Sequence, residues 1–360
     1  MSDSQPQVPD VIRVLDKVAD PLSGRPVTKT DQVKEIDLLD GNLSFTLELT
    51  SHSAPLWEET KQKAIDRLKA ELPQLKEVRI TLAEHARKIE PIGQVGLTVR
   101  SVIAVGSGKG GVGKSTIAAS MAFALKDAGA KVGLLDADVY GPSVPHLLGL
   151  SGRPELIAEK KIAPLERDGV KVMSMGFLVE PERAVIWRGP MLHGAITQFL
   201  RDTAWGELDY LIIDMPPGTG DIALTLSQLL PLTGSVVVCT PQDVALIDAV
   251  KAIAMFNTVK IPVLGVVENM SGFICPDTGK EWDIFGKGGA QRKAQEMGVP
   301  FLGDVPITIS IREKGDQGAA PQVVRDELTA SHFQAICQNL VRGLAENAAA
   351  NPPMPTLTVL

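Results

Sequence analysis

A glycine-rich segment in the first half of the chain constrains the fold more than any other feature. It reads Gly108-Lys-Gly-Gly-Val-Gly-Lys-Ser115 and fits the G-x-x-x-x-G-K-[ST] pattern of a phosphate-binding loop. The apolar run 102–106 in front of it predicts a strand, and a helix is expected to begin at Ser115. Because both flanks agree with the loop, a glycine-rich turn without chemical meaning is the weaker interpretation.

The residue types in this segment suit phosphate chemistry. Glycine lets backbone N–H groups wrap around phosphate oxygens, and the helix that follows adds its positive N-terminal dipole. Lys114 is expected to reach the β- and γ-phosphates, and the Ser115 hydroxyl is expected to bind Mg²⁺. The predicted nucleotide-binding positions in the loop are Gly108, Lys109, Gly110, Gly111, Val112, Gly113, Lys114, Ser115 and Thr116.

Acidic residues follow two other apolar runs. Asp214 ends the run 211–213, at the edge of an α/β sheet where ligands bind, and it is a predicted Mg²⁺ ligand. The alternative for Asp214 is a helix cap, which the following Pro216-Pro217-Gly218 disfavours. Asp136 and Asp138 follow the run 132–135 and are candidates for the metal shell and for the attacking water, or alternatively form a turn.

The chain divides into two regions that differ in their pattern of predicted helices and strands. Residues 1–90 alternate short helices and strands, including a hairpin across Asp40-Gly41-Asn42, and predict a small α+β domain. Residues 91–97 read as a linker and residues 347–360 as a flexible tail. Residues 98–346 alternate apolar strands with helical segments, so we expect an α/β domain with a mostly parallel sheet flanked by helices. The strands expected there are 102–106, 132–135, 211–213, 236–239 and 263–267.

The composition limits which binding partners and which cellular compartment are expected. The 360 residues include 36 Lys plus Arg against 43 Asp plus Glu, a net charge of −7, so we expect no nucleic-acid binding. No apolar run is long enough to span a membrane, and the first ten residues lack a signal pattern. With only three cysteines, a disulfide framework is not expected. We therefore expect a cytoplasmic protein without a membrane partner.

Lys109 is the unusual residue of the loop, because an ordinary phosphate-binding loop tolerates almost any side chain there. Alone, it reads as a solvated surface lysine. GKGGVGKST, however, resembles the deviant Walker A loop of the MinD/ParA/nitrogenase-reductase class of P-loop NTPases. That resemblance implies a homodimer in which Lys109 reaches the partner's nucleotide, as an arginine finger does elsewhere. It also implies that Lys109, Lys114 and Asp138 are catalytic, with Asp138 orienting the water and Asp136 near the Mg²⁺ shell.

Several longer segments carry a more specific likeness, and they are DADVYGPS (136–143), WRGPM (187–191), IDMPPGTGD (213–221), ENMSGF (268–273), FGKGGA (285–290) and SIREKGD (310–316). These segments resemble the Mrp/ApbC family of iron–sulfur cluster carrier ATPases, and the DPLSG stretch at 20–24 is similar to a SufT/PaaD-like metal–sulfur assembly domain. The family implies ATP, Mg²⁺ and a 4Fe–4S cluster, with apo iron–sulfur proteins and assembly factors as partners. It also implies that Asn269 binds the adenine edge.

One departure from that family concerns the cluster ligands. The family carries a Cys-x-x-Cys pair after ENM, whereas this chain has Cys275 followed by Thr278. Iron–sulfur cubanes typically bind four thiolates, and a dimer of this chain offers two at this place. Three interpretations stay open for Cys275: a labile cluster completed by an exogenous ligand, a chain that kept ATPase and docking functions without a cluster, or an incidental thiol. Cys239 and Cys337 read as small buried apolar residues.

The sequence thus predicts an ATP-hydrolysing iron–sulfur cluster carrier that acts as a homodimer. Two alternatives remain: a positioning ATPase of the ParA/MinD type, which shares the loop and Lys109, and an assembly factor that no longer holds its own cluster.

Overall fold

The computed structural model describes residues 6–157, 161–178, 189–218 and 220–350. The chain forms two compact units. Unit 1 contains the residues up to Lys88 together with those from Val341 onward, and unit 2 contains Ile89–Leu340. The expected tail 347–360 begins within a helix that extends to Ala350, and the rest of it lies outside the described residues, as do the first two positions of the WRGPM segment.

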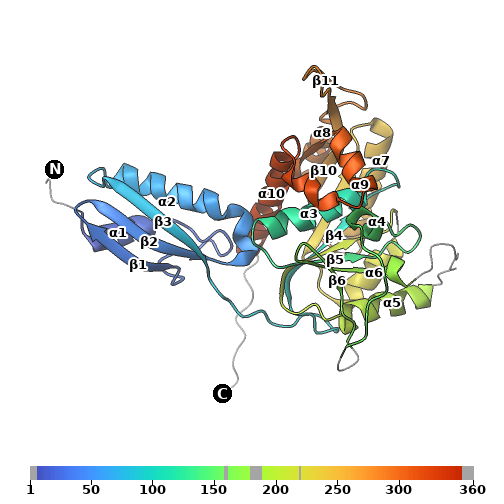
Figure 1. The fold of residues 1–360 in the computed structure, drawn as a ribbon, viewed down its shortest axis with the longest axis horizontal. Coiled ribbons are helices and arrows are strands. Elements are labelled where there is room, and N and C mark those ends of the chain that lie inside the picture. Colours follow the sequence, from blue (N-terminus) through green and yellow to red (C-terminus); the bar gives the residue numbers. More distant parts are fainter. Residues whose placement is uncertain (1–5, 158–160, 179–188, 219, 351–360) are drawn as a thin grey trace. The chain divides into compact units, whose positions relative to one another are not determined.

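Unit 1 is a three-stranded sheet covered by two helices (Figure 1). The order is β1-β2-β3, with β1 and β2 antiparallel and β2 and β3 parallel. Alternate residues of β2 are buried against the helices in one apolar core, which includes Leu43, Phe45, Leu47 and Leu49. The elements are α1 (Val8–Leu15), β1 (Val33–Leu39), β2 (Asn42–Leu49), η1 (Ser51–Leu56), α2 (Trp57–Glu71) and β3 (Glu77–Glu84).

The hairpin of unit 1 has the expected turn. Asp40 and Gly41 both have positive φ, +54° and +84°, which is the backbone that a tight two-residue hairpin turn requires. The predicted small α+β domain is therefore confirmed.

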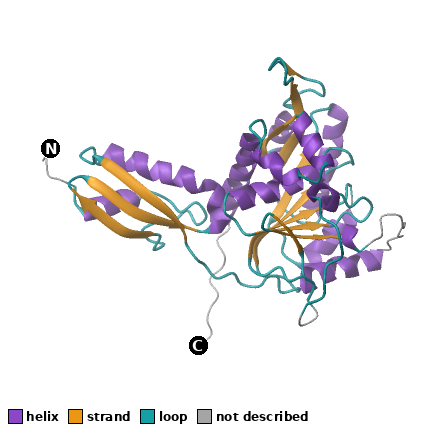
Figure 2. Cartoon of the chain, viewed as in Figure 1, coloured by secondary structure: helices purple, strands orange, loops and turns teal. Residues whose placement is uncertain are grey.

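Unit 2 is an α/β sheet flanked by helices, as predicted (Figure 2). Its strands run in the order β11-β10-β9-β4-β8-β5-β7-β6, and β12 also pairs with β10. The elements are β4 (Val99–Gly106), α3 (Lys114–Asp127), β5 (Val132–Asp136), α4 (Val144–Leu148), β6 (Leu165–Arg167), β7 (Val170–Ser174), η3 (Met175–Phe177), α5 (Gly189–Asp202), β8 (Leu208–Asp214), α6 (Gly220–Leu229), β9 (Gly234–Cys239), α7 (Asp243–Thr258), β10 (Val263–Ile274), β11 (Glu281–Trp282), α8 (Gly289–Met297), β12 (Phe301–Ile307), α9 (Ile309–Asp316), η4 (Ala320–Arg325) and α10 (Ala330–Ala350).

The strand order determines where the functional residues meet. β4, β8 and β5 are neighbours and parallel, so their carboxyl ends lie at one edge of the sheet. The glycine-rich loop follows β4, while Asp136 and Asp214 end β5 and β8 directly opposite each other in register. The parallel arrangement, with antiparallel pairs only at β6/β7 and β10/β11 among the described strands of this sheet, confirms the expected fold class.

The structure differs from the prediction at two boundaries, the end of β10 and the end of the second domain. β10 continues seven residues past the expected end at 267, because β12 and β11 supply backbone partners as far as Ile274. The expected domain 98–346 also differs at its end, since the residues from Val341 onward belong to unit 1, where Arg342 pairs with Glu59 at 2.8 Å. No helix in the described part of the chain is both long and apolar enough to cross a membrane.

Candidate functional site

The glycine-rich loop joins β4 to α3 and depends on glycine at two positions. Gly111 and Gly113 have φ of +81° and +79°, a region that L side chains adopt at a cost of about 1 kcal/mol or more. Gly113 also caps α3. A β-carbon at Gly113 would lie 2.2 Å from the side-chain nitrogen of Asn269, so a larger residue would require the Asn269 side chain to move.

A cavity of about 310 Å³ lies inside the loop. It brings together most of the predicted phosphate-binding residues and Asp138, although these come from segments on three strands. The lining residues are Ser107, Lys109, Gly110, Gly111, Gly113, Lys114, Ser115, Thr116, Asp138, Gly141, Ser143, Leu147 and Pro217. The volume and the glycine-rich wall suit the phosphate groups of a nucleotide.

Lys114 lies at the base of this cavity and is buried. Its Nζ lies 2.5 Å from Asp214 Oδ1, 3.2 Å from Ser115 Oγ and 3.9 Å from Asp138 Oδ2. A buried ammonium group needs partners of this kind, because its desolvation is expensive. Three residues that the sequence assigns to the site, Asp214, Ser115 and Asp138, thus surround one cation.

Asp214 is fully buried and retains one unused oxygen. Its Oδ1 accepts from Lys114, whereas Oδ2 has no hydrogen-bond partner. Burial raises the pKa of Asp214 against the opposing effect of the Lys114 ammonium. Mg²⁺ prefers hard oxygen ligands, and the unpartnered oxygen beside the Ser115 hydroxyl fits that donor set.

Asp136 is buried as completely, but its oxygens are already used. Oδ1 accepts from the Asp138 amide at 3.1 Å, and Oδ2 accepts from the Ser174 hydroxyl at 2.9 Å and the Val144 amide at 3.2 Å. Burial, together with the nearby Asp214 charge, raises the pKa of Asp136 to about 7. These contacts make Asp136 the anchor of the segment that carries Asp138.

Asp138 faces the cavity on a turn. Its Oδ1 accepts from the amides of Tyr140 and Gly141, both at 3.2 Å, and Oδ2 is the oxygen nearest Lys114. The structure therefore combines the two interpretations of the sequence, because the same carboxylate forms a turn and lines the phosphate cavity.

Asn269 and Lys109 lie on different sides of the loop. The Asn269 side-chain nitrogen donates to the Val112 carbonyl at 2.8 Å, and Asn269 does not line the cavity. Lys109 does line it, and its carbonyl accepts from Ser107 Oγ at 2.9 Å. Asn269 thus hydrogen-bonds the loop from another strand, whereas Lys109 belongs to the loop and lines the cavity.

Cys275 lies on the hairpin between β10 and β11. Its amide donates to the Lys280 carbonyl at 3.0 Å and its carbonyl accepts from the Gly279 amide at 2.8 Å. The Thr278 hydroxyl and the amides of Asp277 and Thr278 hydrogen-bond the thiol and lower its pKa. Residue 278 therefore assists the thiolate as a hydrogen-bond donor, although it replaces the expected second cysteine.

The other two cysteines differ from Cys275 in burial. Cys239 and Cys337 are both buried, which raises the pKa of each thiol to about 12. They fit the expectation of small apolar core residues. Within the described ranges, no group of three or more His, Cys, Asp or Glu is placed to hold a metal ion in one copy of the chain.

Sequence reasoning missed Glu268. This carboxylate is fully buried, and it accepts from the Ser271 hydroxyl at 2.6 Å and from the amides of Gly288 and Ala290 at 2.7 and 2.6 Å. It joins the middle of β10 to the start of α8. An acidic residue that directly follows the apolar run 263–267 is the signal that could have indicated it, because a charge is rarely buried without partners.

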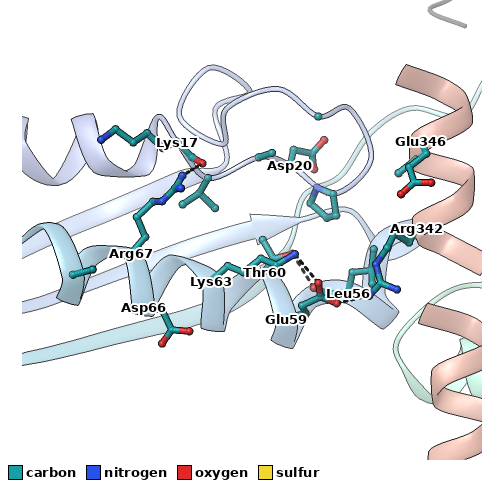
Figure 3. Close-up of a pocket in the computed structure, with 16 residues that line it drawn as sticks. Lys17, Asp20, Leu56, Glu59, Thr60, Lys63, Asp66, Arg67, Arg342 and Glu346 are labelled. Carbon is teal, nitrogen blue, oxygen red and sulfur yellow. Dashed lines mark hydrogen bonds and ion pairs between the residues drawn. The ribbon is translucent and has the colours of Figure 1, made fainter. Parts of the chain in front are cut away.

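Unit 1 contains a larger cavity of about 770 Å³, bordered by the DPLSG loop (Figure 3). Asp20 is buried and holds this loop, since it accepts from the Ser23 amide at 2.9 Å. Lys63 and Arg342 in the wall both pair with Glu59, at 2.6 and 2.8 Å. Both cations in this wall thus share one carboxylate partner, whereas Asp214 beside the phosphate cavity keeps one oxygen without a hydrogen-bond partner.

Comparison with known proteins agrees with these two parts. Residues 98–341 match the family model described as NUBPL iron-transfer P-loop NTPase, and residues 9–82 match that of iron–sulfur cluster assembly protein. The iron–sulfur cluster carrier protein of Deinococcus radiodurans is 42% identical over 352 residues, covering 97% of each chain. That of Synechocystis is 46% identical over 329 residues, which is 89% of this chain and 92% of the relative.

A solved structure supports the fold of unit 2. The nucleotide-binding protein of Archaeoglobus fulgidus in complex with ADP is 43% identical, with a TM-score of 0.55 over 62% of this chain and 88% of that one. With the phosphate-binding loop, the acidic strand ends and the matched models in place, the chain belongs to the NUBPL-type iron-transfer P-loop NTPase family and carries an N-terminal iron–sulfur cluster assembly domain.

Proposed function

We propose that this protein is an ATP-dependent iron–sulfur cluster carrier. The observation that carries the proposal is a glycine-lined cavity bordered by Lys114 and Ser115, in which the Lys114 ammonium also contacts the buried Asp214, in a chain of the iron-transfer NTPase family. A buried cation beside an unpartnered carboxylate oxygen suits a nucleotide with its metal ion. The similarity to the iron–sulfur cluster carrier proteins of Synechocystis and Deinococcus radiodurans supports an iron–sulfur cluster as the cargo.

The site residues have different roles in nucleotide binding and hydrolysis. Residues 108–116 bind the phosphates, Asn269 contacts the adenine edge, and Ser115 and Asp214 hold Mg²⁺ with Asp136 behind them. When bound, the ion would offset negative charge on the phosphates. Asp138 orients the attacking water with the oxygen that faces Lys114, and the amides of Tyr140 and Gly141 fix that carboxylate.

We propose that the working unit is a cytoplasmic homodimer in which Lys109 reaches the partner's nucleotide. Lys109 lines the cavity and is partly exposed, so a second copy can approach it. The partners would be apo iron–sulfur proteins and assembly factors. A dimer would also bring a second Cys275 into reach of the same cluster.

The cargo is a 4Fe–4S cluster held on the two Cys275 thiolates and an exogenous ligand. The lowered pKa of Cys275 favours this use, because the thiolate is the form that binds iron. Thr278 favours the second candidate function, an assembly factor without its own cluster, because a hydroxyl is a poor iron ligand at neutral pH.

Anaerobic reconstitution with iron and sulfide tests the cargo. Wild type, Cys275→Ala and the matched control Cys337→Ala would be compared by iron content and visible spectrum, each with and without ATP. We expect about four irons per dimer in wild type and in the control, and loss in Cys275→Ala. Iron that is absent from wild type, or unaffected by Cys275→Ala, favours the assembly factor.

A further inference from the structure

The segment that carries Cys275 is a hairpin arm pinned to the rest of unit 2 at its base. Phe273 and Ile274 pair with Trp282 and Glu281 across β10 and β11, and the Gly272 amide donates to the Gly286 carbonyl at 3.3 Å. Residues 272–286 are thus joined to one another along the length of the arm. Such an arm can change orientation as one body if its base changes.

The backbone at the base of the arm is irregular, as expected of a hinge. Between Asn269 and Phe273 the register with β12 shifts, so that four steps on β10 match two on β12. Met270 and Gly272 have φ of +61° and +70° on one side of the base, and Gly286 has φ of +91° on the other. A non-glycine residue with positive φ persists only where its surroundings hold it there.

Two side chains in the middle of β10 hold this backbone in place. Glu268 accepts from Ser271 inside the irregular segment and from the amides of Gly288 and Ala290 beyond the arm. Asn269, next along the strand, donates to Val112 in the phosphate-binding loop. The strand that leads into the arm is therefore hydrogen-bonded to the phosphate-binding loop three residues before the arm begins.

One peptide unit joins the two sites. The Val112 carbonyl that accepts from Asn269 and the Gly113 N–H belong to the same trans peptide, so they point in opposite directions. Gly113 lines the phosphate cavity. A phosphate oxygen that accepts from this N–H polarises the unit and strengthens the bond between Val112 and Asn269.

We propose that Asn269 is a positioning residue through which an occupied phosphate site holds the Cys275 arm more firmly. This inference rests on the proposed function, because it takes the cavity to bind a nucleotide. It assigns the regulation of the thiol to the Val112–Gly113 peptide and to the hydrogen bond that Asn269 donates to Val112, and not to the contact proposed between Asn269 and the adenine edge.

The rate of Cys275 alkylation tests this, because the other two cysteines are buried. The full chain is treated with N-ethylmaleimide alone, with saturating Mg-ADP, or with saturating Mg-tripolyphosphate, which has no adenine. We expect either ligand to slow wild-type alkylation by roughly fivefold, the low end of couplings between sites. A response to ADP but not to tripolyphosphate, or no slowing by bound ADP, would overturn the inference.

Asn269→Asp keeps the size of the side chain but replaces the donor with an acceptor. We expect its alkylation rate to be the same with and without ADP, at concentrations that its own titration shows to saturate. Asn339→Asp is the matched control, because Asn339 donates to the Leu302 carbonyl at the same 2.8 Å, and it should keep the full response.

An Asn269→Asp variant that keeps the wild-type response contradicts the inference. If that variant does not fold, Asn269→Ala removes the same bond without adding charge and has the same expected result. Wild type that binds no nucleotide contradicts the proposed function, whereas nucleotide binding without a change in thiol rate contradicts only this inference.

Discussion

Lys114 Nζ lies 2.5 Å from Asp214 Oδ1, and both side chains are buried at the carboxyl end of the central strands. The two residues are a hundred positions apart in the sequence. Their charges neutralise each other in the absence of nucleotide, which allows a site made for phosphate and metal to exist inside the protein.

We expect Lys114→Met to lower the free energy of unfolding by about 3 kcal/mol, because it leaves the buried Asp214 without its cation. The double variant with Asp214→Asn should recover most of that loss, since it removes the uncompensated charge. Urea denaturation of the wild type, of Lys114→Met and Asp214→Asn alone, and of the double variant measures the coupling. Neither Lys114 variant should hydrolyse ATP, because the phosphate contact is lost.

Lys63→Met is the matched control for that cycle. Lys63 forms an ion pair of similar length with Glu59, 2.6 Å, but its side chain is 69% exposed. Its removal should change the free energy of unfolding by less than about 1 kcal/mol. Equal losses at Lys114 and Lys63 would show that burial does not set the strength of the Lys114–Asp214 pair.

Thr278→Val should raise the pKa of the Cys275 thiol. The Thr278 hydroxyl is the main group that lowers this pKa, and hydrogen bonds to a thiolate favour its charged form. The midpoint of the pH–rate profile for alkylation should therefore move to higher pH, so that the rate at neutral pH falls. Thr258→Val, on helix α7, removes another threonine hydroxyl and should leave the midpoint in place. An unchanged midpoint in Thr278→Val would show that the backbone amides alone set this pKa.

Thr278→Cys should increase the amount of cluster that the protein holds. It restores the Cys-x-x-Cys spacing, so that a dimer offers four thiolates in place of two. We expect more iron after reconstitution and slower loss of iron to a chelator than in wild type. The same substitution combined with Cys275→Ala is the control for a single new thiol. If Thr278→Cys holds no more iron than wild type, the hairpin does not place residue 278 toward the cluster.

The sequence predicts the two domains, the loop and the acidic strand ends because each depends on a local pattern. A strand followed by a glycine-rich turn and a helix is visible within fifteen residues or so, and parallel strands bring their ends together whatever their separation in the chain. The bond between Asn269 and Val112 joins residues 157 positions apart, and no local pattern indicates it. The position of Glu268 after an apolar run could have indicated a buried carboxylate, but its partners could not be predicted, because the amides of Gly288 and Ala290 are groups that every residue except proline offers.

Gly113→Ala should destabilise the protein more than its backbone conformation alone explains. With φ of +79°, a β-carbon at this position costs about 1 kcal/mol. It would also lie 2.2 Å from the Asn269 side-chain nitrogen, and overpacking of this kind costs about 1 to 3 kcal/mol more. ADP binding should weaken as well, because Asn269 must withdraw from the loop. Thermal or urea unfolding and a nucleotide titration measure the two effects.

Gly24→Ala separates the backbone cost from the clash. Gly24 has φ of +66°, similar to Gly113, but a β-carbon there would meet nothing within 4 Å. Its substitution should therefore cost about 1 kcal/mol and leave ADP binding unchanged. If the two alanine variants lose the same stability, Asn269 moves aside freely, and the phosphate-binding loop is not held from behind in the way that the distance of 2.8 Å to Val112 indicates.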